Sequence, residues 1–310
     1  MNSLTNNFKR KGFFEGWYFK HQAGSRIIAF IPSFNTDASG KSRVLIQIIT
    51  NDNSHTVSYP LGDLRIDRKN SIIRVGNNVF SKKGMIVDID TGELKVKGIL
   101  RYGKMTPIGY TIMGIFQYFP GMECKHEIIS MYHKVYGNLT YNGKLYRFSP
   151  GTGYMEKDRG YSFPESYFWI QCNYFPGDKC SVFISIADIP YHGIRFQGCI
   201  CALRYHNREY RLATYLGVKI IKYSRTELCL KQGSYLLNVK LFEERPSKIK
   251  EENSLKEGRA FSHKLFAPVL GDMTRTIKEQ HFTTGRFILY HKGKTVFDLF
   301  SREVSYEYVE

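Results

Sequence analysis

The stretch L-T-Y-N-G-K-L-Y-R-F, residues 139–148, decides the fold class of this chain. Its centre, Asn142-Gly143, favours the left-handed backbone of a two-residue turn, and strand-like residues flank it on both sides. It therefore predicts a β-hairpin and gives the strongest short-range hairpin signal in the sequence.

Similar short runs of β-branched and aromatic residues recur along the chain, each bounded by turn residues. They include residues 26–31, which end at Pro32, and residues 44–50, 85–89 and 93–100. The chain also has 22 Tyr and 22 Phe, which favour strands over helices. Many short strands with little helix predict an all-β protein, built as a sandwich or a barrel.

One segment departs from the strand pattern. Residues Arg245 to Glu257 are charge-rich and begin beside Pro246, which predicts a helix or a loosely structured segment.

The chain repeats itself weakly, with an offset of roughly 150 residues. Trp17–Lys20 and Phe168–Gln171 are each followed by a turn and a strand that ends at a proline. A Gly-Lys hairpin lies nearer the end of each half, at Gly143-Lys144 and at Gly293-Lys294. Chance similarity of β-hairpins is the alternative, but matched features in the same order favour a duplication.

The segment S-P-G-T-G, residues 149–153, interrupts the strand pattern near the middle of the chain. We place a domain boundary there, which divides the chain into two successive β-domains, 1–150 and 151–310. A length of 310 residues is enough for two domains of ordinary size.

The chain is strongly basic, with 45 Lys and Arg against 28 Asp and Glu and a formal charge of +17. Such a surface attracts nucleic acid, anionic lipid or acidic partners. The charge is spread thinly, however, and no nucleic-acid-binding motif accompanies it. We therefore expect a solubilising surface, no nucleic-acid partner, and at most peripheral contact with an anionic membrane.

The six cysteines show no C-x-x-C pair, and residues 1–11 are polar and basic rather than signal-like. We expect free thiols in a cytoplasmic protein. The longest apolar stretch, residues 110–119, is about half a membrane span. The oligomeric state is not readable from the sequence.

Two further segments are more particular than a generic strand. The first is F-F-E-G-W-Y-F-K, residues 13–20, and the second runs from Gly153 through E-K-D-R-G to F-W-I-Q-C-N, ending at Asn173. Together they resemble the tocopherol cyclase family, whose members carry F-E-G-W-Y-F-K and E-K-x-x-G-x-x-F-P-x-x-x-F-W-x-Q-C-N. Residues 125–133 and 265–273 add support, so the resemblance covers nearly the whole chain.

The resemblance implies two lipocalin-like antiparallel β-barrel domains, a fold shared with carotenoid hydratase-like proteins. It also implies a cofactor-independent reaction in which a prenylated hydroquinone closes into a chromanol ring. One departure concerns the centre of the motif, because Asp158-Arg159 stands where the cyclases have an Asn-Trp pair. This difference affects the expected substrate and reaction.

A ring closure of this kind protonates an alkene, and a phenol oxygen then traps the tertiary cation. It needs a well-placed acid in a water-poor pocket, with aromatic faces that stabilise the cation. We assign the acid to Asp158 or Glu156, because burial among apolar rings keeps a carboxyl group protonated. The remaining predicted substrate-binding residues lie in or beside the motifs: Glu15, Trp17, Tyr18, Lys20, His133, Tyr154, Tyr167, Trp169 and Gln171.

Each assignment has a structural alternative. Glu15 could form an ion pair with Lys20 or Lys157, and residues 156–159 could be a solvated turn. Trp17 and Trp169 could close the ends of two barrels. We expect no metal site, since His126 and His133 are seven residues apart and would face opposite sides of a strand.

Three functions remain open. The first is a tocopherol cyclase-like enzyme acting on a lipophilic, prenylated substrate, with residues 156–160 meeting residues 13–20 across the domain boundary. The second is a lipocalin-like carrier or sensor of an apolar small molecule. A basic module for anionic membrane surfaces is a third, weaker reading.

Overall fold

The computed structural model describes residues 10–191, 193–242 and 261–310, and most of these residues are in β-strands. The predicted segment 245–257 lies outside the described residues. The strands are β1 (Phe13–Ala23), β2 (Arg26–Thr36), β3 (Ser42–Thr50), β4 (Ser54–Tyr59), β5 (Leu64–Asp67), β6 (Ile72–Val75), β7 (Asn78–Ser81), β8 (Gly84–Asp90), β9 (Lys95–Tyr102), β10 (Cys124–Tyr141), β11 (Lys144–Gly160), β12 (Tyr167–Cys172), β13 (Cys180–Tyr191), β14 (Ile194–Tyr205), β15 (Arg208–Ala213), β16 (Lys219–Tyr223), β17 (Glu227–Gln232), β18 (Tyr235–Phe242), β19 (Phe261–Val269), β20 (Asp272–His291) and β21 (Lys294–Val309).

Helical structure in the described ranges is confined to short 3-10 turns, at Leu61–Asp63, Gly114–Tyr118 and Thr214–Leu216. None of the helices there is long and apolar enough to cross a membrane.

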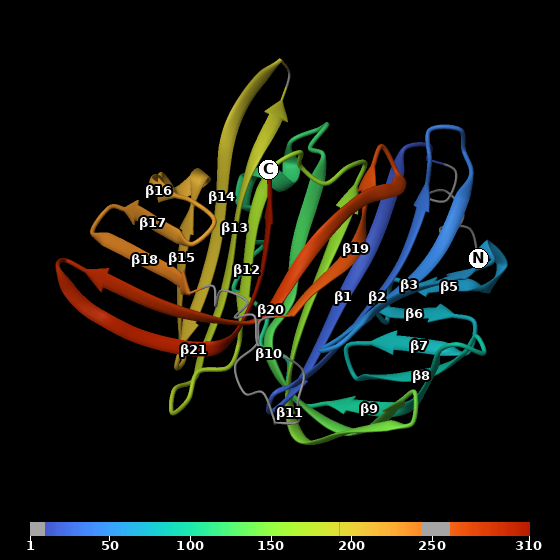
Figure 1. The fold of residues 1–310 in the computed structure, drawn as a ribbon. Coiled ribbons are helices and arrows are strands. Elements are labelled where there is room, and N and C mark those ends of the chain that lie inside the picture. The colour runs from blue at the N-terminus through green and yellow to red at the C-terminus, as the bar shows by residue number, and fades with distance from the viewer. Residues whose placement is uncertain (1–9, 192, 243–260) are drawn as a thin grey trace, which may run out of the picture. The chain divides into compact units, whose positions relative to one another are not determined.

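The described strands form two antiparallel sheets (Figure 1). The first has the order β4-β3-β2-β1-β11-β10-β9-β8-β7-β6-β5 and curves into a nearly closed barrel. The second has the order β15-β14-β13-β12-β21-β20-β18-β17-β16, and β19 also pairs with β20. In the first sheet β1 pairs with β11, which also pairs with β10. In the second sheet β12 pairs with β21, which also pairs with β20. The prediction of an all-β, antiparallel fold is confirmed, and this shared order agrees with the weak sequence repeat.

The predicted hairpin at residues 139–148 is confirmed. Tyr141 pairs with Lys144 across the turn, and both turn residues have positive φ, 46° at Asn142 and 79° at Gly143. The predicted end of a strand at Pro32 is wrong, because β2 continues to Thr36. Pro32 interrupts only the β1 ladder and still pairs with Ile46 of β3.

The chain separates into two compact units that differ from the halves 1–150 and 151–310. Unit 1 takes its described residues from 1–113, 119–163 and 265–276, and unit 2 takes its own from 114–118, 164–264 and 277–310. The proposed boundary segment, 149–153, lies within β11, because Thr152 pairs with Gln22 on one side and Lys134 on the other. Independent folding of two domains stays a prediction.

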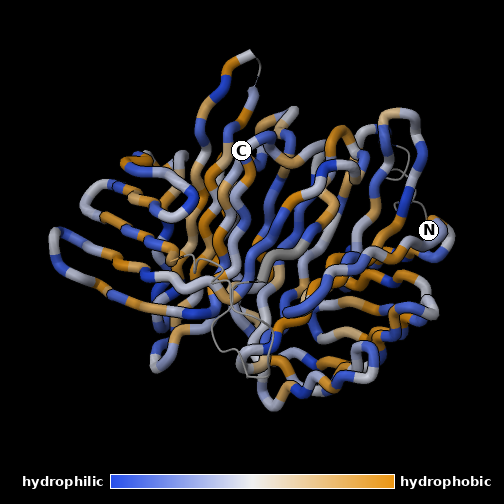
Figure 2. Tube along the Cα trace, in the orientation of Figure 1, coloured by the Kyte–Doolittle hydropathy of each residue, from blue (hydrophilic) through white to orange (hydrophobic). Residues whose placement is uncertain are grey.

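The core of unit 1 is built by strict alternation along its short strands. In β8, for example, Met85, Val87 and Ile89 are buried, and the residues between them are exposed. Figure 2 shows this alternation of hydrophobic and hydrophilic residues along β5 to β9. The buried members pack with residues of β1 and β2 into one hydrophobic cluster, to which Phe19 and Phe30 belong.

Two histidines interrupt this apolar interior. Tyr102 donates its hydroxyl hydrogen to Nε2 of His21 at 2.6 Å, and Nδ1–H of His21 donates to the carbonyl oxygen of Ile28 at 3.1 Å. The ring of His133 lies 4.7 Å from the ring of Tyr102. It also lies so close to Gly153 that a Cβ there would be 2.3 Å from Nε2 of His133. The glycine is therefore required by the position of the imidazole.

Both histidines favour the neutral form. Burial lowers the pKa of His21 to about 3, assisted by the neighbouring His133, although the bond to Ile28 opposes the shift. Burial alone lowers the pKa of His133 to about 3.

The unfolding free energy should fall as the pH decreases from about 6.5 towards 3. In this range the unfolded chain binds protons at His21 and His133 that the folded chain excludes, so protonation favours the unfolded state. Above the unfolded pKa of about 6.5 both states hold neutral histidines, and this loss of stability is absent. Denaturant melts between pH 7 and 4 would measure the slope, and His133→Gln should make it shallower. A His133→Gln slope as steep as the parent's would contradict the assignment.

All six cysteines are free in the structure, and four of them are buried. Cys199 and Cys201 both lie at 0% exposure, two residues apart on β14, as expected for one face of a strand. Burial raises the pKa of both thiols, so they remain protonated and unreactive.

Alkylation of the unfolded but non-reduced protein should therefore modify six thiols, as measured by intact mass. A protein with only four modified thiols would contain a disulfide and contradict this prediction.

Candidate functional site

The two sequence motifs of unit 1 meet in the centre of its sheet. Strand β1 pairs with β11, which places Gly16 opposite Asp158 and Tyr18 opposite Glu156. The predicted approach of residues 13–20 and 156–160 is confirmed, but both segments belong to unit 1, so the predicted crossing of a domain boundary is wrong. The turn interpretation of residues 156–159 is also wrong, because they are part of β11.

Strand alternation divides the predicted site residues between two faces of the sheet. Trp17, Phe19 and Met155 point into the hydrophobic core of unit 1. The residues between them, such as Tyr18 and Glu156, therefore lie on the opposite face. Residues close in the motif thus belong to two different environments.

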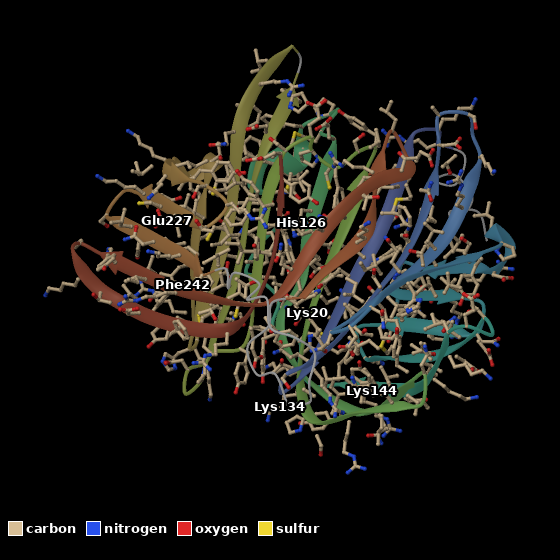
Figure 3. The ribbon with its side chains drawn as sticks, viewed as in Figure 1. Lys20, His126, Lys134, Lys144, Glu227 and Phe242 are labelled. Atoms are coloured by element: carbon tan, nitrogen blue, oxygen red, sulfur yellow. The ribbon has the colours of Figure 1, made fainter. Side chains whose placement is uncertain are left out.

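The opposite face holds a buried cluster of titratable groups around His126 of β10, which pairs with Asp158 across the strands. Nδ1–H of His126 donates to Oδ1 of Asp158 at 2.6 Å, and Nε2 lies 3.4 Å from Oε2 of Glu156. Tyr154 donates its hydroxyl hydrogen to the same Glu156 oxygen. The thiol of Cys124 approaches Asp158 at 3.7 Å. We call these five residues the His126 cluster; Figure 3 labels His126.

The cluster is shielded from water. The side chains of Glu156, His126 and Asp158 are 7%, 11% and 17% exposed. Tyr154 is fully buried, and its ring lies 6.4 Å from that of Tyr18 in an edge-on arrangement. Asp158 is therefore not open to solvent, as the predicted catalytic role requires.

The carboxylates hold a proton on His126. Burial lowers the pKa of this imidazole, but the charges of Asp158 and Glu156 and their hydrogen bonds outweigh burial and raise it to about 10. Burial and the same carboxylates raise the pKa of Tyr154 and of Cys124 well above the ordinary values. At neutral pH the cluster thus contains a cationic imidazole and a protonated phenol and thiol.

The same donors have a composition that suits a metal ion. One ligand atom each from His126, Glu156 and Asp158 lies within 4.8 Å of the others, although the sequence predicted no metal site. An imidazole and two carboxylates form a mixed nitrogen and oxygen set, as found around Zn²⁺ or Fe²⁺. His126 was missed as a site residue because only the register between β10 and β11 reveals its partners.

Glu15 lies on the core side of the sheet in an ion-pair network. Arg68 donates to its two carboxylate oxygens at 2.8 and 2.7 Å, and Nζ of Lys157 lies 2.5 Å from Oε1. Burial raises the pKa of Glu15, but hydrogen bonds and charges of Arg68 and Lys157 lower it overall. The structural ion-pair interpretation with Lys157 is confirmed. Arg68 was missed because it lies 53 residues away in sequence.

The other predicted residues of unit 1 are also buried. Trp17 is part of the hydrophobic core, with Nζ of Lys157 at 5.2 Å from its ring, and the barrel-closing interpretation stays a hypothesis. Lys20 is 1% exposed and alternates with the core residues of β1 (Figure 3). His133 lies with His21 and Tyr102 in the barrel interior, not in the His126 cluster.

Three predicted residues belong to unit 2, on β12. Tyr167, Trp169 and Gln171 are buried and alternate with the core residues of that unit. Tyr167 donates its hydroxyl hydrogen to Glu307 at 2.6 Å. A further buried group of unit 2 was not predicted from the sequence: His281 forms a hydrogen bond with Ser305 at 2.7 Å and lies 3.4 Å from Glu279.

Comparison with known proteins agrees with the sequence motifs. Residues 81–195 match the family model described as tocopherol cyclase-like. Over 95 residues the chain is 27% identical to the chloroplastic tocopherol cyclase of Zea mays and 26% identical to the probable chloroplastic tocopherol cyclase of Oryza sativa subsp. japonica. The matched stretch is 31% of this chain and spans 20% of the length of each relative.

The fold has a solved counterpart. The crystal structure of CghA with Sch210972 has a TM-score of 0.57 and 11% sequence identity, and the match covers 96% of this chain and 89% of that chain. At this identity the likeness concerns the fold alone.

The His126 cluster lies within the residues that match the family model. The resemblance expected from the two motifs is confirmed, and the chain is tocopherol cyclase-like over residues 81–195.

Proposed function

We propose that this protein is a cofactor-independent cyclase of a lipophilic, prenylated phenol and that the His126 cluster supplies and recovers the proton. The observation that carries the proposal is the buried contact of His126 with Asp158 and Glu156, in the middle of the family motif. Buried titratable groups with strong mutual interactions are typical of acid–base sites.

The proposed reaction is an isomerisation and needs both a proton donor and a proton acceptor. The alkene π electrons form a new C–H bond with the donated proton, which leaves a tertiary cation. A lone pair of the phenol oxygen then forms the C–O bond, and the phenol proton is released. A site that gives one proton and takes one back ends the cycle unchanged.

The His126 cluster has the parts for both steps. The proton passed to the alkene is the one shared between Nδ1 of His126 and the Asp158 carboxylate; it leaves from the Asp158 oxygen, and the imidazole becomes neutral. Glu156 lies on the other side of the imidazole, with Oε2 at 3.4 Å from Nε2. After the proton has left, the carboxylate faces the cation that has formed and can accept the phenol proton.

The surroundings favour a lipophilic substrate. Tyr18 and Tyr154 present aromatic rings beside the carboxyl groups, and such rings stabilise a passing cation. The low exposure of the cluster excludes water, which would otherwise capture the cation. Asp158-Arg159 stands where the cyclases have an Asn-Trp pair. The proposal therefore names the class of substrate, a prenylated phenol, and not a particular compound.

Asp158→Asn should lower turnover of a prenylated hydroquinone by about 100-fold or more and leave its binding nearly unchanged, because the lost group acts in the transition state. Reaction in D₂O gives a direct measurement, since each turnover places one deuterium on carbon. Glu156→Gln should be milder, since its amide oxygen still accepts the hydrogen bond from Tyr154.

Asp88→Asn is the matched control, because it removes a solvent-facing carboxylate of unit 1 that pairs with Lys97. It should leave turnover unchanged. If the parent protein turns over no prenylated phenol, the proposed enzyme function is wrong and a binding function takes its place.

The pH profile provides a separate test. Since His126 remains cationic up to a pKa of about 10, kcat/KM should not decline near pH 6.5 and should show its alkaline decline near pH 10. Asp158→Asn removes one of the charges that raise this pKa, so the residual activity should decline at a lower pH. An alkaline decline at the same pH in both proteins would exclude His126 as the titrating group.

A further inference from the structure

The core side of the same strands opens into a cavity of about 220 Å³ in unit 1. It is formed where β1, β10 and β11 face the β5–β6 and β7–β8 turns, and none of the residues of the His126 cluster line it. Its lining residues are Trp17, Phe19, Ile66, Asp67, Arg68, Ser71, Ile72, Ile73, Ser81, Lys82, Glu127, Ile129, Met155 and Lys157.

The deeper wall of the cavity is apolar. Trp17, Phe19, Ile73 and Met155 are all at most 6% exposed and belong to the hydrophobic core. A small apolar group placed against them would be removed from water and stabilised accordingly. The volume is below the range of about 300–1,000 Å³ that is typical of drug-sized ligands, so the occupant is small.

The rim of the cavity carries a group of three charges. Arg68 and Lys157 are two cations, and both bind the single buried carboxylate of Glu15. This group of three therefore has a net charge of +1. Glu15 itself is fully buried, so its charge is directed at these two partners rather than at solvent.

Both cations have hydrogen-bonding capacity beyond Glu15. Glu15 accepts one N–H from each terminal nitrogen of Arg68, and a guanidinium has five N–H bonds in total. Three remain for a further acceptor. The Lys157 ammonium has three N–H bonds, of which Glu15 takes one, and lies over the ring of Trp17.

The other charged lining residues are directed elsewhere or towards water. Asp67 accepts hydrogen bonds from the backbone and side chain of Asn70 within its own turn. Glu127 and Lys82 are exposed and of opposite sign. Counted with Glu15, the cavity has three cations (Arg68, Lys82 and Lys157) and three carboxylates (Glu15, Asp67 and Glu127), so its charges balance. What favours an anion is the set of N–H groups that Arg68 and Lys157 have beyond those given to Glu15.

We propose that this cavity is a second binding site, separate from the His126 cluster, for the anion of a small apolar carboxylic acid. The apolar body lies against Trp17 and Met155, and the carboxylate accepts hydrogen bonds from Arg68 and Lys157. Glu15 occupies the end of the guanidinium, so the ligand carboxylate accepts from its side edge, where Nε–H and the outer N–H of one terminal nitrogen form a second pair of parallel donors. The site does not depend on the proposed cyclase reaction, because its residues face the other side of the sheet.

The test uses 3-phenylpropionate as the probe and its uncharged amide as the matched compound, with binding measured by calorimetry and ligand-observed NMR. The carboxylate should bind about tenfold or more tightly than the amide, because charge-assisted hydrogen bonds are the stronger kind. Its affinity should fall as the salt concentration increases. Equal binding of both compounds, or binding of neither, would overturn the proposal.

Arg68→Gln should weaken probe binding by about tenfold or more. Arg43→Gln is the matched control, since Arg43 pairs with the carboxylate of Asp272 in unit 1 and has the same 40% side-chain exposure as Arg68. Circular dichroism would check that both variants fold. If Arg68→Gln binds the probe like the parent, the proposal is wrong.

Ile72→Trp tests the same site without changing its charges, because the larger ring at the rim fills the cavity. It should abolish probe binding, and unchanged affinity would place the probe elsewhere and refute the site. His126→Gln should bind the probe like the parent. A loss of probe binding in His126→Gln would assign the probe to the His126 cluster and refute a second site, whereas failure of the cyclase assay leaves the probe measurements unaffected.

Discussion

The position of β1 between β2 and β11, with both of its faces buried, is the constraint on which unit 1 depends. A strand that is exposed on one face needs apolar residues at every second position only. Here every residue from Phe13 to Gln22 is at least half-buried, so each side chain must be compatible with an interior. The F-E-G-W-Y-F-K motif is the sequence that meets this requirement, and Gly16 allows close approach to Ser33 of β2.

Burial on both faces explains why the charged residues of the motif occur in groups. An isolated ion loses several kcal/mol of solvation when it leaves water, and only partners at hydrogen-bonding distance offset that loss. Glu15 therefore has two cations, and His126 has two carboxylates. The groups have opposite net charge, so the two faces of the same strands offer different chemistry to ligands.

The fold class and the hairpin at Asn142-Gly143 were readable from the sequence because they depend on local signals. The contact of residues 13–20 with residues 156–160 was expected from the family resemblance instead, since no local pattern links strands so far apart in the chain. The partners of the acidic residues were not readable. Arg68 reaches Glu15 from a distant turn, and the register of β10 against β11 places His126 beside Asp158. Such contacts depend on register and on barrel closure, which no local pattern encodes.

The alternation along β1 also has a consequence for evolution. Substitutions at Trp17 or Phe19 act on the cavity side, whereas those at Tyr18 or Lys20 act on the His126 side. One segment can therefore diverge in two independent ways, with one binding preference retained while the other changes. A single insertion or deletion within it would exchange the two sets at once, so length should be under stronger selection than residue identity.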